Sequence, residues 1–229
     1  QSKRVTFLTL SNHFFSAADP LPAGRGIYPM LISRADVIGF DLYPLQVWCR
    51  RDALRAVYES QLQLVGLAKG KPTFQWIEAG AMNQCGARPE LDPTPATVRA
   101  ETWLAIAGGA RGIGFFPDWF QPPIARAVRG ISDEIASLTP ALLTSATPVT
   151  VAPATPLAVG ARKLNGATYV IGVNPTPRAT SGTIRVPGLR ATSVRVYGES
   201  RTVGVRNGAF SDRFAGLALH VYIAAPRGS

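Results

Sequence analysis

The chain has 229 residues, of which 46% are hydrophobic, and its 24 basic and 14 acidic side chains give a formal net charge of +10. This apolar content excludes a disordered chain, and no apolar run approaches the roughly 20 residues of a membrane-spanning helix. With only two cysteines and two histidines, a zinc site with four Cys/His ligands is not expected.

The first 147 residues alternate between short β-branched or aromatic runs and segments with helical periodicity. Because strand–helix alternation is typical of βα units, these residues predict a parallel sheet covered by helices. The expected strands span residues 5–11, 36–43, 72–78 and 111–116, and the expected helices span 28–34, 52–68, 94–107 and 122–143.

Local signals support two of these helices. Asp52 stands where it can cap the helix 52–68, and Thr94-Pro95 is a cap followed by proline in the first turn of 94–107. Gly108-Gly109 ends that helix. A glycine-rich dinucleotide loop follows a strand, whereas the glycines here precede one, so we expect no cofactor.

From residue 148 onward the sequence predicts a second, all-β domain. Prolines interrupt its beginning, and the dipeptides Asn165-Gly166 and Asn207-Gly208 are typical of hairpin turns. We therefore expect domains at 1–147 and 148–229, the second a small antiparallel β-sandwich. Its predicted strands span 167–173, 183–186, 193–197, 202–205 and 218–224.

The net charge is concentrated in this second domain. Residues 148–229 hold ten basic and two acidic side chains, a net of +8, and residues 1–147 carry only +2. Either this is an ordinary arginine-rich surface, or the domain attracts a polyanion such as an acidic glycan. No basic run exceeds two residues, so we expect no specific nucleic-acid partner.

Polar and aromatic residues follow the predicted strands of the first domain, where the sites of parallel α/β domains lie. His13 follows the first strand, Asp41 and Tyr43 end the second, Glu78 ends the third and Trp119 follows the fourth. Carboxylates beside aromatic faces are typical of carbohydrate sites.

Each of these residues also has a simpler interpretation. Burying the Glu78 carboxylate at the end of an apolar strand is costly, so Glu78 is expected either to act in the site or to pair with an arginine. Asp41 alternates in phase with Tyr43 and either faces the site or serves in an ion pair or a loop cap. Tyr43 can donate a hydrogen bond to Glu78 or simply pack. His13, Trp119 and Trp48 bind substrate or belong to the packing.

Cys49 and Cys85 lie on loops that follow neighbouring strands. A disulfide between them indicates an oxidising compartment, and hence a secreted or extracytoplasmic protein. The competing hypothesis is a reactive thiol beside His13, although no nucleophile motif surrounds Cys49.

Four segments of the chain carry a resemblance to a known family: residues 35–44 (ADVIGFDLYP), 71–80 (KPTFQWIEAG), 99–116 (RAETWLAIAGGARGIGFF), and 208–214 (GAFSDRF) with 220–222 (HVY). Together they resemble the retaining glycoside hydrolases of the large (β/α)8 clan that includes β-galactosidases, β-glucanases and β-mannanases. The resemblance places the four segments, in that order, at the sixth strand, the seventh strand with its nucleophile, the seventh helix with the eighth strand, and the end of a following β-sandwich.

The resemblance implies the second half of a TIM barrel and a double-displacement mechanism. Glu78 would be the nucleophile and would be oriented by Tyr43. Trp119 would form the floor of the sugar-binding subsite at the cleaved bond. The family's acid/base is a glutamate usually preceded by asparagine, and this chain has no Asn-Glu pair. A complete barrel needs about 250 residues, so the acid/base and an N-terminal half-barrel are expected on an upstream segment.

The alternative function is a non-catalytic carbohydrate- or cell-wall-binding protein with a basic β domain. A glutamate on the partner segment facing Glu78 would favour the hydrolase, and its absence would favour binding. The expected partners are therefore an oligo- or polysaccharide and the half-barrel segment.

Overall fold

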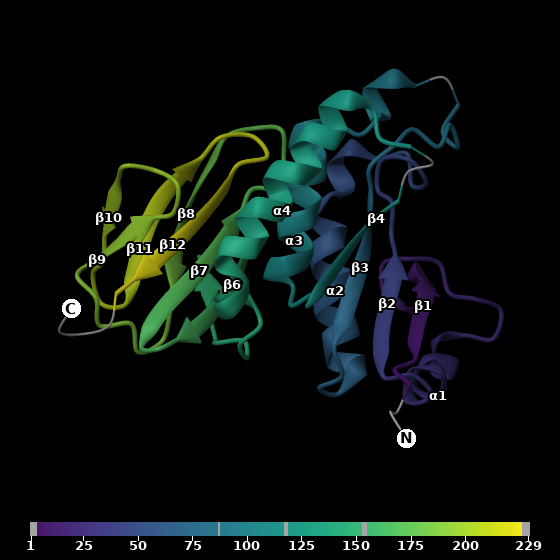
Figure 1. Ribbon diagram of the computed structural model, residues 1–229, viewed down its shortest axis with the longest axis horizontal. Coiled ribbons are helices and arrows are strands. Elements are labelled where there is room, and N and C mark those ends of the chain that lie inside the picture. Colours follow the sequence, from purple (N-terminus) through teal and green to yellow (C-terminus); the bar gives the residue numbers. More distant parts are fainter. Residues whose placement is uncertain (1–3, 87, 117–118, 153–154, 226–229) are drawn as a thin grey trace. The chain divides into compact units, whose positions relative to one another are not determined.

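The computed structural model describes residues 4–86, 88–116, 119–152 and 155–225 (Figure 1). Contacts divide the chain into an N-terminal unit, Gln1–Ala127, and a C-terminal unit, Val128–Ser229. This division falls inside helix α4, Pro122–Leu142. The domain boundary expected after residue 147 differs from this division by contacts, which does not test it, and it stays a prediction. None of the described helices is long and apolar enough to cross a membrane.

The N-terminal unit contains a four-stranded parallel sheet in the order β1-β2-β3-β4. All four predicted strands are present, each within three residues of its expected ends. Figure 1 shows them side by side in chain order. Their bounds are Phe7–Ser11 for β1, Val37–Asp41 for β2, Thr73–Glu78 for β3 and Gly112–Phe116 for β4.

Helical segments connect the strands, as the alternating pattern predicts. The helices are α1 (Tyr28–Ser33), α2 (Arg55–Ala68), α3 (Pro95–Ala107) and α4, and four short 3-10 turns span Asn12–Phe14, Arg25–Ile27, Arg51–Ala53 and Pro89–Leu91. The Thr94 cap of α3 is confirmed, because its side chain accepts the Thr97 N–H. The prediction that Asp52 caps α2 is wrong. Asp52 lies in a 3-10 turn before the helix and pairs with Arg50 instead.

The two faces of the parallel sheet differ sharply in exposure. Ile38, Phe40 and Ile77 point to one face and have no exposed surface. On the other face Phe7 is 70% exposed, and Phe74 and Trp76 are partly exposed. These side chains, with Val37 and Ile113 among others, line an apolar hollow.

Glycines make room for the aromatic rings on this open face. A Cβ at Gly39 would collide with the Phe74 ring, and one at Gly114 would collide with the Trp76 ring. Phe74 pairs with Gly39 across the β2–β3 ladder, and Trp76 pairs with Gly114 across the β3–β4 ladder. The rings therefore lie flat across neighbouring strands.

The C-terminal unit contains two antiparallel sheets, ordered β10-β9-β12-β7-β6 and β11-β8-β5. One hydrophobic cluster contains side chains of both sheets, including Ile184 and Phe214 from one and Val170 and Tyr222 from the other. The strands are β5 Thr150–Val151, β6 Ala158–Leu164, β7 Ala167–Val173, β8 Thr180–Arg185, β9 Ser193–Val196, β10 Thr202–Gly204, β11 Ala209–Phe214 and β12 Leu219–Ala224.

Both predicted hairpin turns are confirmed. Asn165-Gly166 joins β6 to β7 with positive φ angles of 49° and 79°, and Asn207-Gly208 turns the chain before β11 at 50° and 72°. The strands β5, β6 and β11 were not among the strands predicted from local pattern. The sequence of β6 is AVGARKL, and its glycine and two cations weaken the apolar pattern that predicts a strand. Its first five residues are nevertheless buried.

Candidate functional site

The predicted site residues meet at the carboxyl-terminal edge of the parallel sheet. Asp41 is the last residue of β2 and pairs with Ser11 at the end of β1. Glu78 is the last residue of β3 and pairs with Phe116 at the end of β4. The topology therefore places both carboxylates at the same edge, as strand ends in a parallel sheet require.

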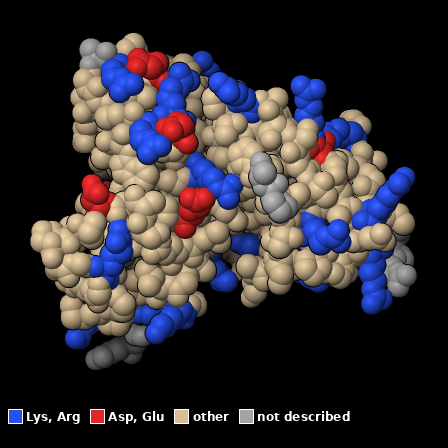
Figure 2. Space-filling view, turned by 180° about the vertical axis from the view of Figure 1, so that it is seen from behind, with Lys and Arg blue, Asp and Glu red and all other residues tan. Residues whose placement is uncertain are grey.

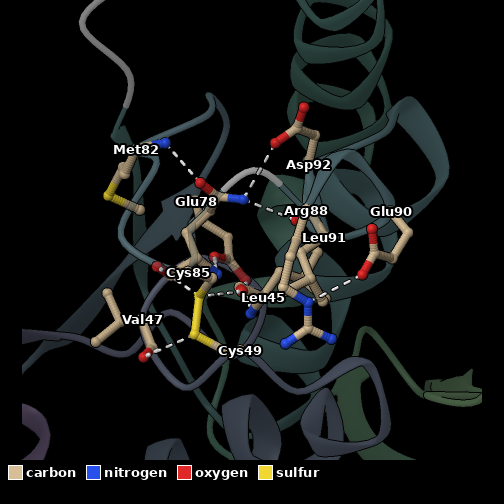
Figure 3. Close-up of a disulfide and its surroundings, with 11 residues drawn as sticks. Leu45, Val47, Cys49, Glu78, Met82, Cys85, Arg88, Glu90, Leu91 and Asp92 are labelled. Carbon is tan, nitrogen blue, oxygen red and sulfur yellow. Dashed lines mark hydrogen bonds and ion pairs between the residues drawn. A yellow bond between two sulfur atoms is a disulfide. The ribbon is translucent and has the colours of Figure 1, made fainter.

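Glu78 has no exposed surface, and both of its carboxylate oxygens bind the loop that follows β2. The Leu45 N–H donates to Oε1 and the Gln46 N–H donates to Oε2, each over 2.8 Å (Figure 3). These backbone donors orient the carboxylate, and the expected orientation of Glu78 by the Tyr43 hydroxyl stays a prediction.

A second buried carboxyl group, Glu101 on α3, lies against Glu78. Burial raises the pKa of Glu101 well above its usual range, and the negative charge of Glu78 raises it further. Burial also raises the pKa of Glu78 to about 7, while the N–H bonds from Leu45 and Gln46 counteract part of the increase. Both carboxyl oxygens of Glu101 are buried and have no hydrogen-bond partner among the described residues, so its protonated form is favoured over its charged form.

Gln46 connects three segments above this edge. It is 2% exposed, its amide nitrogen donates to the Leu91 carbonyl over 2.8 Å, and its amide oxygen accepts the Met82 N–H over 2.5 Å. Because a buried amide is costly unless its groups are bonded, these contacts fix the loops after β2 and β3 together with the approach to α3.

The disulfide lies in the same assembly of loops. Cys49 and Cys85 are bonded, with Cα atoms 5.6 Å apart and 36 residues of sequence separation (Figure 3). Neither sulfur is a free thiol, which contradicts the alternative of a reactive cysteine beside His13.

Sequence reasoning missed Gln46 and Glu101. Glu101 carried a usable signal, since it stands three residues after Val98 and four before Ala105 on the buried side of α3. A charge at such a position is rare unless it is paired. Gln46 carried no local signal, because its partners come from segments 36 and 45 residues away.

Asp41, Tyr43 and His13 interact electrostatically. Burial raises the pKa of Asp41, and the charge of His13 opposes this. Burial also raises the pKa of Tyr43, helped by the charges of Asp41 and Glu78. The Tyr43 ring stacks on Phe116 with centroids 5.6 Å apart. The structure thus brings Asp41, Tyr43 and Glu78 together, with Asp41 still partly exposed.

The other predicted residues have mainly structural contacts. His13 Nδ1 donates to the Asp19 carbonyl over 2.7 Å, which fixes the ring within its own loop. Trp48 stacks parallel to Phe15 with centroids 6.4 Å apart. Trp119 is 63% exposed, and its role as a sugar platform stays a prediction. Across the described residues, no group of three or more His, Cys, Asp or Glu side chains could hold a metal ion.

No family model and no curated protein matches this sequence. Solved structures of glycoside hydrolases are similar to it in fold. A GH27 β-L-arabinopyranosidase from Geobacillus stearothermophilus matches 98% of this chain and 58% of its own, with 11% identity and a TM-score of 0.63.

Two amylases match in the same way. An α-amylase from Geobacillus thermoleovorans is 14% identical over 87% of this chain and 51% of its own, with a TM-score of 0.58. The maltogenic α-amylase AmyB from Thermotoga neapolitana is 10% identical over 85% and 52%, also with a TM-score of 0.58. The chain spans about half the length of these enzymes, and at such identities the similarity concerns the fold.

Proposed function

We propose that this chain is the carboxyl-terminal part of a (β/α)8-barrel glycoside hydrolase that cleaves an oligo- or polysaccharide. The observation that carries the proposal is a sheet of four parallel βα units with Asp41 and Glu78 at its carboxyl-terminal edge. This is the edge at which barrel enzymes hold substrate. The fold similarity to glycosidases over 85–98% of the chain supports it.

An N-terminal half-barrel segment completes the enzyme in this proposal. In the described part of the chain β1 and β4 are edge strands, each paired on one side. Unprotected parallel edges and an exposed apolar face are unfavourable in water, so further strands are expected to cover them. The solved glycosidases, almost twice as long as this chain, contain enough additional chain for such a half. The C-terminal unit would be the accompanying β-sandwich.

The proposed mechanism is double displacement with retention. Glu78 attacks the anomeric carbon, and a carboxylic acid about 5 Å away, on the completing segment, protonates the leaving oxygen. The same residue, now a carboxylate, deprotonates a water molecule that attacks the anomeric carbon and breaks its bond to Glu78. Because its oxygens bind the Leu45 and Gln46 N–H groups, the loop 42–50 must open before Glu78 can attack. Asp41 is already partly exposed, and its raised pKa suits proton transfer or contact with sugar hydroxyls.

A second candidate function is carbohydrate binding without hydrolysis. The closed position of Glu78 favours it, since a nucleophile with no exposed surface cannot reach a sugar. In that case Glu78 would serve only to hold the loop after β2. The disulfide suits a secreted or extracytoplasmic location for either function.

Hydrolysis of a panel of nitrophenyl glycosides and oligosaccharides by the longest natural form of the protein tests the proposal. Glu78→Gln should lower kcat by at least about 10³-fold while circular dichroism stays unchanged. The matched control Asp52→Asn removes an exposed, arginine-paired carboxylate and should leave kcat unchanged. NMR of the first-formed anomer should show retention. Full activity of Glu78→Gln would refute its role, and inversion would refute the mechanism.

A further inference from the structure

The C-terminal unit has two carboxylates between residues 148 and 229, and both are engaged. Glu199 pairs with Arg201 and binds His220 Nδ1 over 2.6 Å. Asp212 pairs with Arg201 over 2.9 Å and accepts the Tyr222 hydroxyl over 2.8 Å. Among the described arginines of this segment, Arg185, Arg206 and Arg213 form no ion pair with either carboxylate. Figure 2 shows basic side chains predominating over acidic ones on one face of the molecule.

Arg206 lines a groove between the edge strands β10 and β11. Arg185 and Arg213 do not line it, but they lie on the same outward face as its lining residues Thr183 and Ser211. The groove has a volume of about 440 Å³, and its walls come from Thr183 on β8, Ser211 on β11 and Arg206 before β11. The remaining lining residues are Val203, Gly204, Ala209 and Phe210. Its volume lies within the usual range of small-molecule sites.

The register of β8 and β11 sets a row of polar side chains along this groove. Thr183 pairs with Ser211, and their hydroxyls are 2.7 Å apart and hydrogen-bonded. Arg185 stands two residues after Thr183, and Arg213 two residues after Ser211, so both arginines share the outward face with the hydroxyls. Arg185 also donates to the Asn207 carbonyl over 2.9 Å, which holds it at the turn before β11.

We propose that this groove binds an acidic oligosaccharide, with Arg206, Arg213 and Arg185 as partners of its carboxylates and Thr183 and Ser211 as partners of its hydroxyls. Guanidinium groups match carboxylate oxygens in charge and in fork geometry. The choice of a glycan rests on the proposed function. It extends that function by assigning an anionic substrate class to a surface separate from the strand-end site.

The chemistry of the groove disfavours other polyanions. Single-stranded nucleic acids bind through exposed aromatic rings on which bases stack, and the one aromatic lining residue, Phe210, is only 2% exposed. Neutral sugars likewise lack a ring to stack on. Charge must therefore supply most of the affinity, which predicts binding that weakens as salt is added.

Isothermal titration with a galacturonic acid hexamer, in the protein carrying Glu78→Gln to prevent turnover, tests the inference. We expect saturable binding at low salt that weakens between 20 and 300 mM NaCl, values chosen to span roughly 20 to 6 Å of Debye length. Arg206→Ser/Arg213→Ser should weaken it by about tenfold or more. Lys163→Ser/Arg190→Ser, a control with the same charge loss in another hollow, should weaken it by less than about threefold.

Three outcomes would overturn the inference: no binding of the hexamer, equal loss in the two double variants, or equal affinity for maltohexaose or a 20-nucleotide DNA strand. The proposed hydrolysis is judged separately with the nitrophenyl panel. Hydrolysis without hexamer binding refutes the groove alone, and hexamer binding without hydrolysis refutes the catalytic proposal alone.

Discussion

The buried carboxyl pair makes stability depend on pH in a way that Glu78→Gln should remove. The folded protein holds a proton on Glu78 up to about pH 7, whereas the unfolded chain releases it near 4.5. A raised carboxyl pKa therefore stabilises the fold below pH 4.5, and this contribution is lost as the pH rises to about 7. At roughly 1.4 kcal/mol per pH unit, the interval corresponds to about 3 kcal/mol.

The assay is urea unfolding of the wild type and Glu78→Gln at intervals between pH 4 and 8. The free energy of unfolding of the wild type, minus that of the variant, should fall by about 3 kcal/mol across the window. Burial, the largest cause of the raised pKa of Glu101, is present in both proteins, whereas the part caused by the charge of Glu78 is lost in the variant. Glu59→Gln, which removes an exposed partner of Arg55 on α2, is the matched control and should preserve the wild-type slope.

A constant difference between wild type and Glu78→Gln from pH 4 to 8 would refute the reasoning. It would mean that Glu78 titrates near its ordinary pKa, and hence that it is exposed to water. The same measurement therefore reports whether the loop after β2 closes over Glu78 in solution.

Two further predictions concern the fold that supports the site. Reducing the disulfide, or replacing Cys49 and Cys85 with serine, should lower the free energy of unfolding by about 3–4 kcal/mol, because the bond closes a loop of 36 residues; an unchanged melting temperature in dithiothreitol would contradict this. Gly39→Ala should destabilise by about 1–3 kcal/mol through collision with the Phe74 ring. Gly66→Ala, in open space on α2, should be neutral or stabilising by up to about 1 kcal/mol in the same denaturation assay. Equal effects of the two alanines would refute the packing argument.

The sequence by itself determined the parallel strands, their helices and the edge where Asp41 and Glu78 meet. These follow from local signals: the period of apolar residues, the Thr94 cap and the asparagine-glycine turns each act over a few residues. The same locality explains the errors. Strand β6 was missed because its glycine and cations weaken the local pattern, although its neighbours in the sheet bury it.

Only the tertiary structure decided what surrounds Glu78. Its oxygens bind backbone N–H groups 32 and 33 residues earlier in the chain, and Glu101 approaches it from a helix. Such contacts depend on how loops from separate βα units pack, which no local pattern encodes. The sequence assigns residues 148–229 a net charge of +8 but does not say which charges are paired. Only the tertiary structure shows that both carboxylates of that segment are bound by Arg201, His220 and Tyr222.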